Sequence, residues 1–203
     1  MTEARAVGTK GVPREERETQ IVRAGTEEFG KNGYAGASMV EIARRVGVTK
    51  PLLYQYFGSK DGLYLACLHR AGDRLTEGVA ETMAEEGEPP ERMPLAVLSA
   101  IFETFDNDRY AWKLLRDPTV PSTGEIAGVA VDYRYRLDGF ALVGAAQLMR
   151  SRGLDDDRDI EAIAQVWTGV VDSLISWWID QPDQDAAAMT ERCSRIMRNL
   201  FGW

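Results

Sequence analysis

The chain has 203 residues, 44% of them hydrophobic and 28% charged, which is typical of a globular protein and excludes a disordered one. No apolar run approaches the roughly 20 residues that span a bilayer, and the polar N-terminal segment lacks the apolar stretch of a secretory signal, so we expect a cytoplasmic protein. The net charge of −8 is uneven: residues 1–60 contain ten Lys/Arg and seven Asp/Glu, and the remainder contains 14 and 25. A basic first part is compatible with binding of a polyanion at one end of the molecule.

Apolar side chains recur at spacings of three and four along the chain, and no segment shows sustained alternation, so we predict an all-α fold of about nine helices. The first helix is predicted over residues 14–32 and ends at Gly33. The other helices are predicted over residues 38–46, 50–57, 60–86, 90–106, 108–116, 125–152, 158–180 and 184–201. The segment 117–124 contains two prolines and is predicted as a loop.

Polar residues at two helix starts predict how the second and third helices begin. Ser38 and Glu41 have the spacing of a capping box, in which each side chain binds the other residue's backbone N–H. Thr49 is expected to cap the third helix. A proline at the second position of that helix is tolerated, because the first turn needs no intrahelical N–H donor there.

The third helix has few residues that can join a core. At 100° per residue, Leu53 and Phe57 share one face, whereas Gln55 points almost directly away. A short helix that buries two residues and exposes polar and aromatic ones is better explained as a reading element, so we interpret the second and third helices as a helix-turn-helix. Arg44 and Arg45 on the second helix fit a DNA contact or a solvent-facing surface equally well.

Six short motifs follow one another in the first part of the chain: Gly33-Tyr34, Ser38, Glu41-Ile42-Ala43, Gly47-Val48-Thr49-Lys50, Leu53-Tyr54-Gln55-Tyr56-Phe57 and Ser59-Lys60-Asp61-Gly62-Leu63. Through these motifs, residues 14–66 resemble the N-terminal domain of the TetR family of bacterial repressors. Pro51 departs from the small residue frequent at its position. The resemblance implies a flexible arm over residues 1–13, a three-helix DNA-binding domain over 14–62, and a larger helical domain for ligand binding and dimerisation over 63–203.

The resemblance also implies a repressor that binds a palindromic DNA operator as a homodimer and is released by a small molecule. The residues implied to contact DNA are Ser38, Thr49, Lys50, Pro51, Tyr54, Gln55, Tyr56 and Lys60. Ser38 and Thr49 stand at helix N-termini, where hydroxyl and N–H groups favour phosphate. Gln55 can pair with adenine, Lys50 can reach guanine acceptors, and Lys60 is expected to bind the DNA backbone. The two tyrosines are expected to contact phosphates or thymine methyl groups.

Aromatic residues of the larger domain are the candidates for a ligand pocket. They are Phe102, Phe105, Tyr110, Trp112, Tyr133, Phe140 and Trp167. Each one alone is more often core, but the set predicts a pocket for an apolar or aromatic molecule, with the loop 117–124 as its lid. The last two helices are apolar on more than one face, which favours a homodimer through them, although burial within a monomer is the alternative.

Two other classes of protein compete with this interpretation. An enzyme is not favoured, because the only histidine, His69, has no triad context, and its spacing to Cys67 is not that of metal ligands. We therefore expect no cofactor and no metal, and two reduced, buried cysteines, Cys67 and Cys193. A helical interaction or ligand-binding protein without specific DNA binding is the second alternative, and it predicts no role for Lys50 or Gln55.

Overall fold

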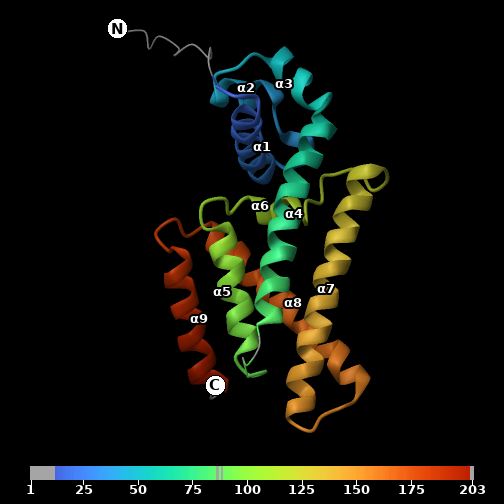
Figure 1. Cartoon of the computed structure of the whole chain (residues 1–203), viewed down its shortest axis with the longest axis vertical. Coiled ribbons are helices and arrows are strands. Elements are labelled where there is room, and N and C mark those ends of the chain that lie inside the picture. Colours follow the sequence, from blue (N-terminus) through green and yellow to red (C-terminus); the bar gives the residue numbers. More distant parts are fainter. Residues whose placement is uncertain (1–11, 86, 88, 202–203) are drawn as a thin grey trace. The chain divides into compact units, whose positions relative to one another are not determined.

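A computed structural model describes residues 12–85, 87 and 89–201 (Figure 1). Every regular element in these ranges is a helix, which confirms the all-α prediction. The helices are α1 (Arg14–Gly36), α2 (Met39–Val46), α3 (Lys50–Phe57), α4 (Lys60–Ala84), α5 (Met93–Phe105), α6 (Ala111–Leu114), α7 (Glu125–Ser151), α8 (Asp157–Ile179) and α9 (Ala186–Phe201). None of them is long and apolar enough to cross a membrane, among the residues described. The predicted N-terminal arm lies outside these residues, apart from Val12 and Pro13.

Gly33 interrupts α1 at the predicted position. Its backbone has φ 69° and ψ 168°, and the helix resumes only as far as Gly36. A Cβ atom on Gly33 would lie 2.6 Å from the Oγ1 atom of Thr119. The positive φ and this close approach both require glycine.

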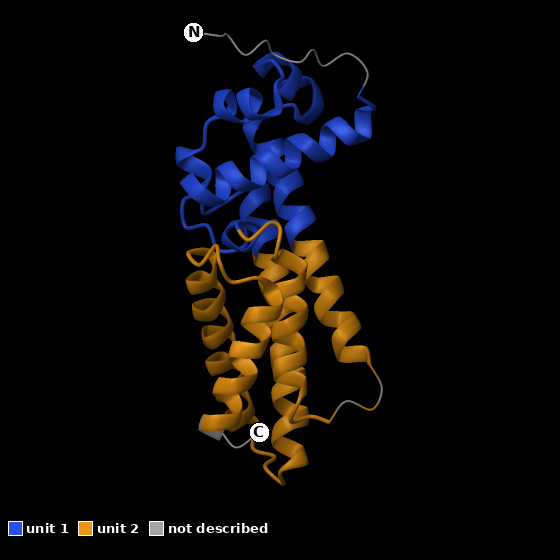
Figure 2. Ribbon diagram, turned by 90° about the vertical axis from the view of Figure 1, so that its left-hand side faces the viewer, with its two compact units in different colours: residues 1–71, 110–130 blue, residues 72–109, 131–203 orange. Residues whose placement is uncertain are grey.

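The contacts divide the chain into two compact units (Figure 2). Unit 1 consists of residues 1–71 and 110–130, and unit 2 consists of residues 72–109 and 131–203. Unit 1 therefore contains α6 and the start of α7 in addition to α1, α2 and α3. Helices α4 and α7 each contribute residues to both units.

Unit 1 has a dense core in which α1 packs on α4 and α6. The rings of Phe29 and Tyr64 meet edge to face with centroids 4.9 Å apart. A Cβ atom on Gly30 would lie 2.5 Å from the carbonyl oxygen of Tyr110, so α1 meets the backbone before α6 directly. Cys67 is buried in this unit and Cys193 in unit 2, so the two thiols form no disulfide, as predicted.

In unit 2, α5 packs against α8 and α9. The Phe102 ring meets the ring of Trp178 edge to face, with centroids 5.1 Å apart. The Arg109 guanidinium lies 4.2 Å from the Trp178 ring centroid and donates to the carbonyl oxygens of Gln181 (2.8 Å) and Gln184 (2.7 Å). Arg109 thus ties the turn between α8 and α9 to the end of α5.

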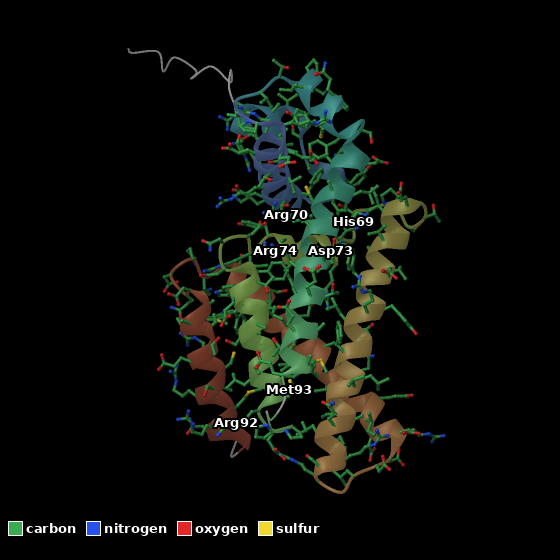
Figure 3. The ribbon with its side chains drawn as sticks, in the orientation of Figure 1. His69, Arg70, Asp73, Arg74, Arg92 and Met93 are labelled. Atoms are coloured by element: carbon green, nitrogen blue, oxygen red, sulfur yellow. The ribbon has the colours of Figure 1, made fainter. Side chains whose placement is uncertain are left out.

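Helix α4 lies between α5 and α7 in unit 2 (Figure 1). Two adjacent side chains, labelled in Figure 3, bind the two flanking helices: Asp73 accepts the hydroxyl of Tyr133 on α7 at 2.5 Å, and Arg74 donates to the carbonyl of Thr104 on α5. Gly72 lets the Tyr133 ring approach α4, because a Cβ atom there would lie 2.5 Å from three ring carbons. Burial raises the pKa of Tyr133 above its ordinary value, so its hydroxyl is a stable donor.

Candidate nucleic-acid interface

Ser38 begins α2, and its side chain and its backbone bind different partners. The Oγ atom accepts the Glu41 N–H at 3.3 Å, which confirms half of the predicted capping box. The other half is wrong, because the Ser38 N–H donates to the Oε1 atom of Glu28 at 3.1 Å. Glu28 is a carboxylate of α1 with 3% of its surface exposed, and its other oxygen accepts from Arg45 at 2.9 Å. Glu28 therefore ties both ends of α2 to α1.

The Glu41 carboxylate is unavailable to Ser38 because it binds two arginines of α2. Arg44 donates to it at 2.7 and 2.9 Å, and Arg45 at 3.1 Å. The hydrogen bond from Arg44, followed by that from Arg45, lowers the pKa of Glu41 to about 2. The Arg45 side chain is 26% exposed and held within the chain, whereas that of Arg44 is 70% exposed.

Helix α3 turns a polar and aromatic face to solvent. The candidate DNA contacts that are exposed on it or at its start are Thr49, Lys50, Pro51, Tyr54 and Gln55, and Tyr56 is half-buried. Leu53 is fully buried, while Phe57, expected as a second anchor, is only half-buried. Thr49 occupies the N-cap position, but its side chain makes no capping hydrogen bond. The Lys50 ammonium lies 5.8 Å from the centre of the Tyr54 ring, within the range of a cation–π contact.

Lys60 binds within the chain at the start of α4. Its ammonium donates to the carbonyl oxygens of Ala37 at 2.8 Å and Ala35 at 3.4 Å. It also lies 5.0 Å from the centre of the Tyr34 ring. The Tyr34 hydroxyl donates to Asp61 at 2.6 Å, which raises the pKa of Tyr34 to about 12. Lys60 thus holds the turn between α1 and α2 against α4, and its contact with DNA stays a prediction.

Asp117 and Thr119, just after α6, bind the same turn. Asp117 accepts the backbone N–H of Tyr34 at 2.6 Å and the hydroxyl of Tyr64 at 3.2 Å. Thr119 accepts the N–H of Ala35 at 3.1 Å and donates its own hydroxyl to Asp117 at 2.7 Å. The loop 117–124 was predicted as a pocket lid, but its first residues hold the turn that precedes α2 by hydrogen bonds. No residue spacing in the sequence indicates this role.

Comparisons with known proteins agree with this geometry. The sequence model described as "Bacterial regulatory proteins, tetR family" matches residues 21–67, which run from α1 through α3 into α4. An uncharacterized HTH-type transcriptional regulator of Mycobacterium tuberculosis is 30% identical over 169 residues, which are 83% of this chain and 77% of that protein. The chain belongs to the TetR family.

Two further proteins are similar to this chain, one in sequence over about half of its length and the other in fold. The HTH-type transcriptional activator FasR of Mycolicibacterium smegmatis is 41% identical over 104 residues, which are 51% of this chain and 47% of that protein. This chain thus spans about half the length of that relative. The crystal structure of the regulator FadR from Bacillus subtilis in complex with stearoyl-CoA superposes with a TM-score of 0.65 at 18% identity, covering 86% of this chain and 94% of FadR. It shows the same fold.

In this TetR-family chain, the predicted ligand residues fall in both units. Tyr110 and Trp112 belong to unit 1, and the others belong to unit 2. The buried members of the set are Phe102, Phe105, Trp112 and Tyr133, and the half-buried members are Tyr110, Phe140 and Trp167. Their convergence on one pocket stays a prediction.

Unit 2 also carries a groove of about 710 Å³ between α5 and α9, which none of the predicted ligand residues line. Thr190 donates to Ser99 across it at 3.1 Å. Charged side chains line much of the rest, among them Glu103, Asp106 and Arg195. This lining does not match the apolar pocket predicted from the sequence. In the described ranges, no three or more His, Cys, Asp or Glu side chains come together in a group that could hold a metal ion.

Helix α8 exposes a regular apolar stripe. Ile163 (38% exposed), Val166 (59%), Val170 (42%) and Trp177 (44%) lie on it, and the small residue Ser173 completes a spacing of three, four, three and four. Helix α9 is different, because Met189 and Cys193 are buried within unit 2 and, of its large apolar side chains described, only Ile196 is exposed. Sequence periodicity alone had assigned two apolar faces to both helices.

Proposed function

We propose that this chain is a cytoplasmic transcriptional repressor that binds a palindromic operator as a homodimer and leaves it when a small effector binds. The observation that carries the proposal is the exposed face of α3, where Lys50, Tyr54 and Gln55 point to solvent. Such side chains read base edges in the major groove. In this proposal residues 14–62 bind DNA, preceded by the arm 1–13, and residues 63–203 bind the effector and the second subunit.

The proposed contacts divide into base reading and backbone binding. Gln55 pairs with adenine and Lys50 with guanine acceptors, and Pro51 sets the start of the helix that carries them. The hydroxyls of Ser38 and Thr49 bind phosphates, as do the tyrosines of α3. Lys60 has three N–H donors, and its two bonds to carbonyls leave one for a phosphate.

The stripe on α8 supports the proposed homodimer through the last two helices. A spacing of alternating three and four residues, from Ile163 to Trp177, is the seam by which two helices pack side by side. Left in water, this seam would expose a row of large apolar side chains. On α9, Arg192 lies 5.6 Å from the Trp177 ring and Ile196 is exposed, so this helix can border the same interface. A two-fold dimer would present its α3 helices to successive major grooves.

The effector in this proposal is a coenzyme A thioester with an apolar acyl group. FadR, which shares the fold, holds stearoyl-CoA, and the buried aromatic residues of unit 2, Phe102, Phe105 and Tyr133, offer apolar surface to an acyl chain. Helix α4 begins in the DNA-binding residues and continues into unit 2. An effector that prefers one arrangement of α4 would change the spacing of the two α3 helices and release DNA.

An activator is the second candidate, favoured by the similarity to FasR over half of each chain. Both candidates share the DNA contacts and differ in what bound protein does to transcription. Transcription in vitro from a promoter with the selected operator separates them: added protein lowers the transcript level for a repressor and raises it for an activator.

Selection of sheared genomic DNA of the source organism on the purified protein tests the proposal. Recovery of inverted repeats is expected, and it should be lost in the variant Lys50→Ala/Tyr54→Ala/Gln55→Ala. The variant Lys113→Ala/Tyr135→Ala/Gln147→Ala removes the same residue types from exposed positions outside α3 and should retain binding. If the α3 variant recovers the same inverted repeats as the unchanged protein, α3 does not read the operator and the proposed contacts are wrong. If the unchanged protein recovers no specific site, the interaction-protein alternative is favoured.

Adding effectors to the protein–operator complex tests the second half of the proposal. Long-chain acyl-CoA is expected to release the operator in a fluorescence anisotropy titration, and free coenzyme A is the matched control that should not. A tightly bound acyl-CoA that leaves operator affinity unchanged would disprove the coupling.

A further inference from the structure

Several basic side chains of unit 1 differ in the partners that hold them. Those bound by carboxylates or carbonyl oxygens of the chain are Lys31, Arg44, Arg45 and Lys60. Two others lie over aromatic rings of α3 instead. The Arg14 guanidinium carbon is 5.3 Å from the centre of the Tyr56 ring, and the Lys50 ammonium is 5.8 Å from that of Tyr54. Only Lys50 belongs to α3 itself, so Arg14 brings a second cation to this helix from α1.

Arg14 is the first residue of α1 and is exposed. A cation–π contact holds a guanidinium mainly by its charge, and none of the five N–H donors of Arg14 is bound to an oxygen acceptor by this contact. Those donors match the oxygens of a phosphate, which guanidinium groups bind through two parallel hydrogen bonds. The contact with Tyr56 therefore leaves the DNA-binding capacity of Arg14 intact.

The neighbours of Arg14 make this ring contact important. Glu15 and Glu16 follow it directly, and their carboxylates would repel a phosphate. Glu16 is occupied by Gln20 at 3.4 Å. A guanidinium that turned freely would spend time near these acids, whereas the Tyr56 ring keeps it beside α3.

We propose that Arg14 is a further DNA-contacting residue, which binds a backbone phosphate next to the site read by α3 and is positioned for it by Tyr56. The proposal rests on the DNA binding proposed above and adds a contact that lies outside the helix-turn-helix. Such a contact carries charge but no sequence information.

Salt dependence of DNA affinity tests this contact. Each phosphate neutralised by a cation contributes about 0.9 to the slope of log K against log salt concentration on duplex DNA. Arg14→Gln is expected to reduce the slope by about 0.9 for each protomer bound and to weaken operator and random DNA by the same factor. Arg14→Lys should keep the slope and lose part of the affinity, because it keeps the charge but not the planar group. Arg23→Gln removes an exposed arginine of the same helix and should leave the slope unchanged.

The outcomes separate this inference from the function on which it rests. If the unchanged protein binds DNA and Arg14→Gln has the same slope, Arg14 makes no phosphate contact and the proposed function stands. An equal loss in Arg14→Gln and Arg23→Gln would also overturn the inference, because it would reflect net charge alone. If the unchanged protein binds no DNA, both proposals fail.

Discussion

Units 1 and 2 differ in the number of large hydrophobic side chains that they expose to solvent. Of the 13 large hydrophobic side chains exposed in the described residues, ten belong to unit 2 and only Val12, Val40 and Tyr54 to unit 1. Unit 1 instead uses buried or half-buried charged side chains, Glu28 and Asp117 among them, to bind backbone N–H groups of one turn. This contrast agrees with a polar partner for unit 1 and favours the proposed apolar contact of unit 2 with a second subunit.

The largest expected effect comes from charging the apolar stripe of unit 2. Val166→Asp/Val170→Asp places four carboxylates in a two-fold interface, where like charges cost several kcal/mol, so the dimer dissociation constant should rise at least about 100-fold. Both side chains are exposed in the single chain, so its fold should be unaffected. Sedimentation over a concentration series measures the shift, with circular dichroism to confirm the helical content.

A substitution on α7 tests whether the dimer interface is confined to the last two helices. Tyr135 on α7 is 78% exposed. Tyr135→Asp should remain dimeric if the interface is confined to the last two helices. Dissociation of this variant, with a dimeric Val166→Asp/Val170→Asp, would move the interface to α7 and contradict the proposal for α8.

The next largest effect is expected from the hydrogen bonds of Asp117, which hold the turn between α1 and α2 in unit 1. Asp117→Ala removes the acceptor of the Tyr34 N–H, and an unpaired donor costs about 1–3 kcal/mol. The buried Tyr64 hydroxyl also loses Asp117 but keeps the carbonyl oxygen of Leu114, at 3.1 Å, as its acceptor. We expect a loss of about 1–3 kcal/mol in the free energy of unfolding, measured by urea titration, and weaker operator binding because the turn before α2 loosens. Asp117→Asn keeps one acceptor oxygen and should lose less.

Removal of an exposed aspartate elsewhere is the control for this prediction. Asp138 is exposed on α7, and Asp138→Ala should change stability by less than about 0.5 kcal/mol. An equal loss in both variants would mean that the hydrogen bonds of Asp117 add nothing to the stability of unit 1.

The sequence predicted the helices well because their signals are local. Gly33 and Ser38 mark ends that depend only on near neighbours, and the structure places both as expected. Local patterns could not predict the hydrogen bond between Asp117 and the Tyr34 N–H, because the two residues are 83 positions apart in the sequence. Glu28 was missed for a related reason, because a glutamate in an amphipathic helix normally indicates a solvent-facing position.

Two site residues show how the competition between partners limits prediction. Glu41 has the spacing of a capping box, yet its carboxylate binds Arg44 and Arg45, and Glu28 takes its place at the Ser38 N–H. Lys60 was assigned to DNA by resemblance, but carbonyl oxygens of the α1–α2 turn lie close enough to bind it first. Spacing identifies groups that can pair and does not rank the partners that the fold supplies.

The smallest expected effect tests whether the ion pairs of Glu41 with Arg44 and Arg45 persist in solution. The pKa of Glu41 is lowered from 4.5 to about 2 by its hydrogen bonds to Arg44 and Arg45. Its contribution to stability is therefore fully present above pH 4.5 and is lost as the pH falls towards 2. Because the Glu41 side chain is 32% exposed, solvent screens its ion pairs and the contribution is small. NMR titration of its side-chain carboxyl measures the ion pairs more directly than unfolding does. Arg44→Gln should move the midpoint back towards 4.5. A midpoint near 4.5 in the unchanged protein would mean that Glu41 releases these arginines in water. Arg44 would then be available to DNA, whereas Arg45 would keep its bond to Glu28.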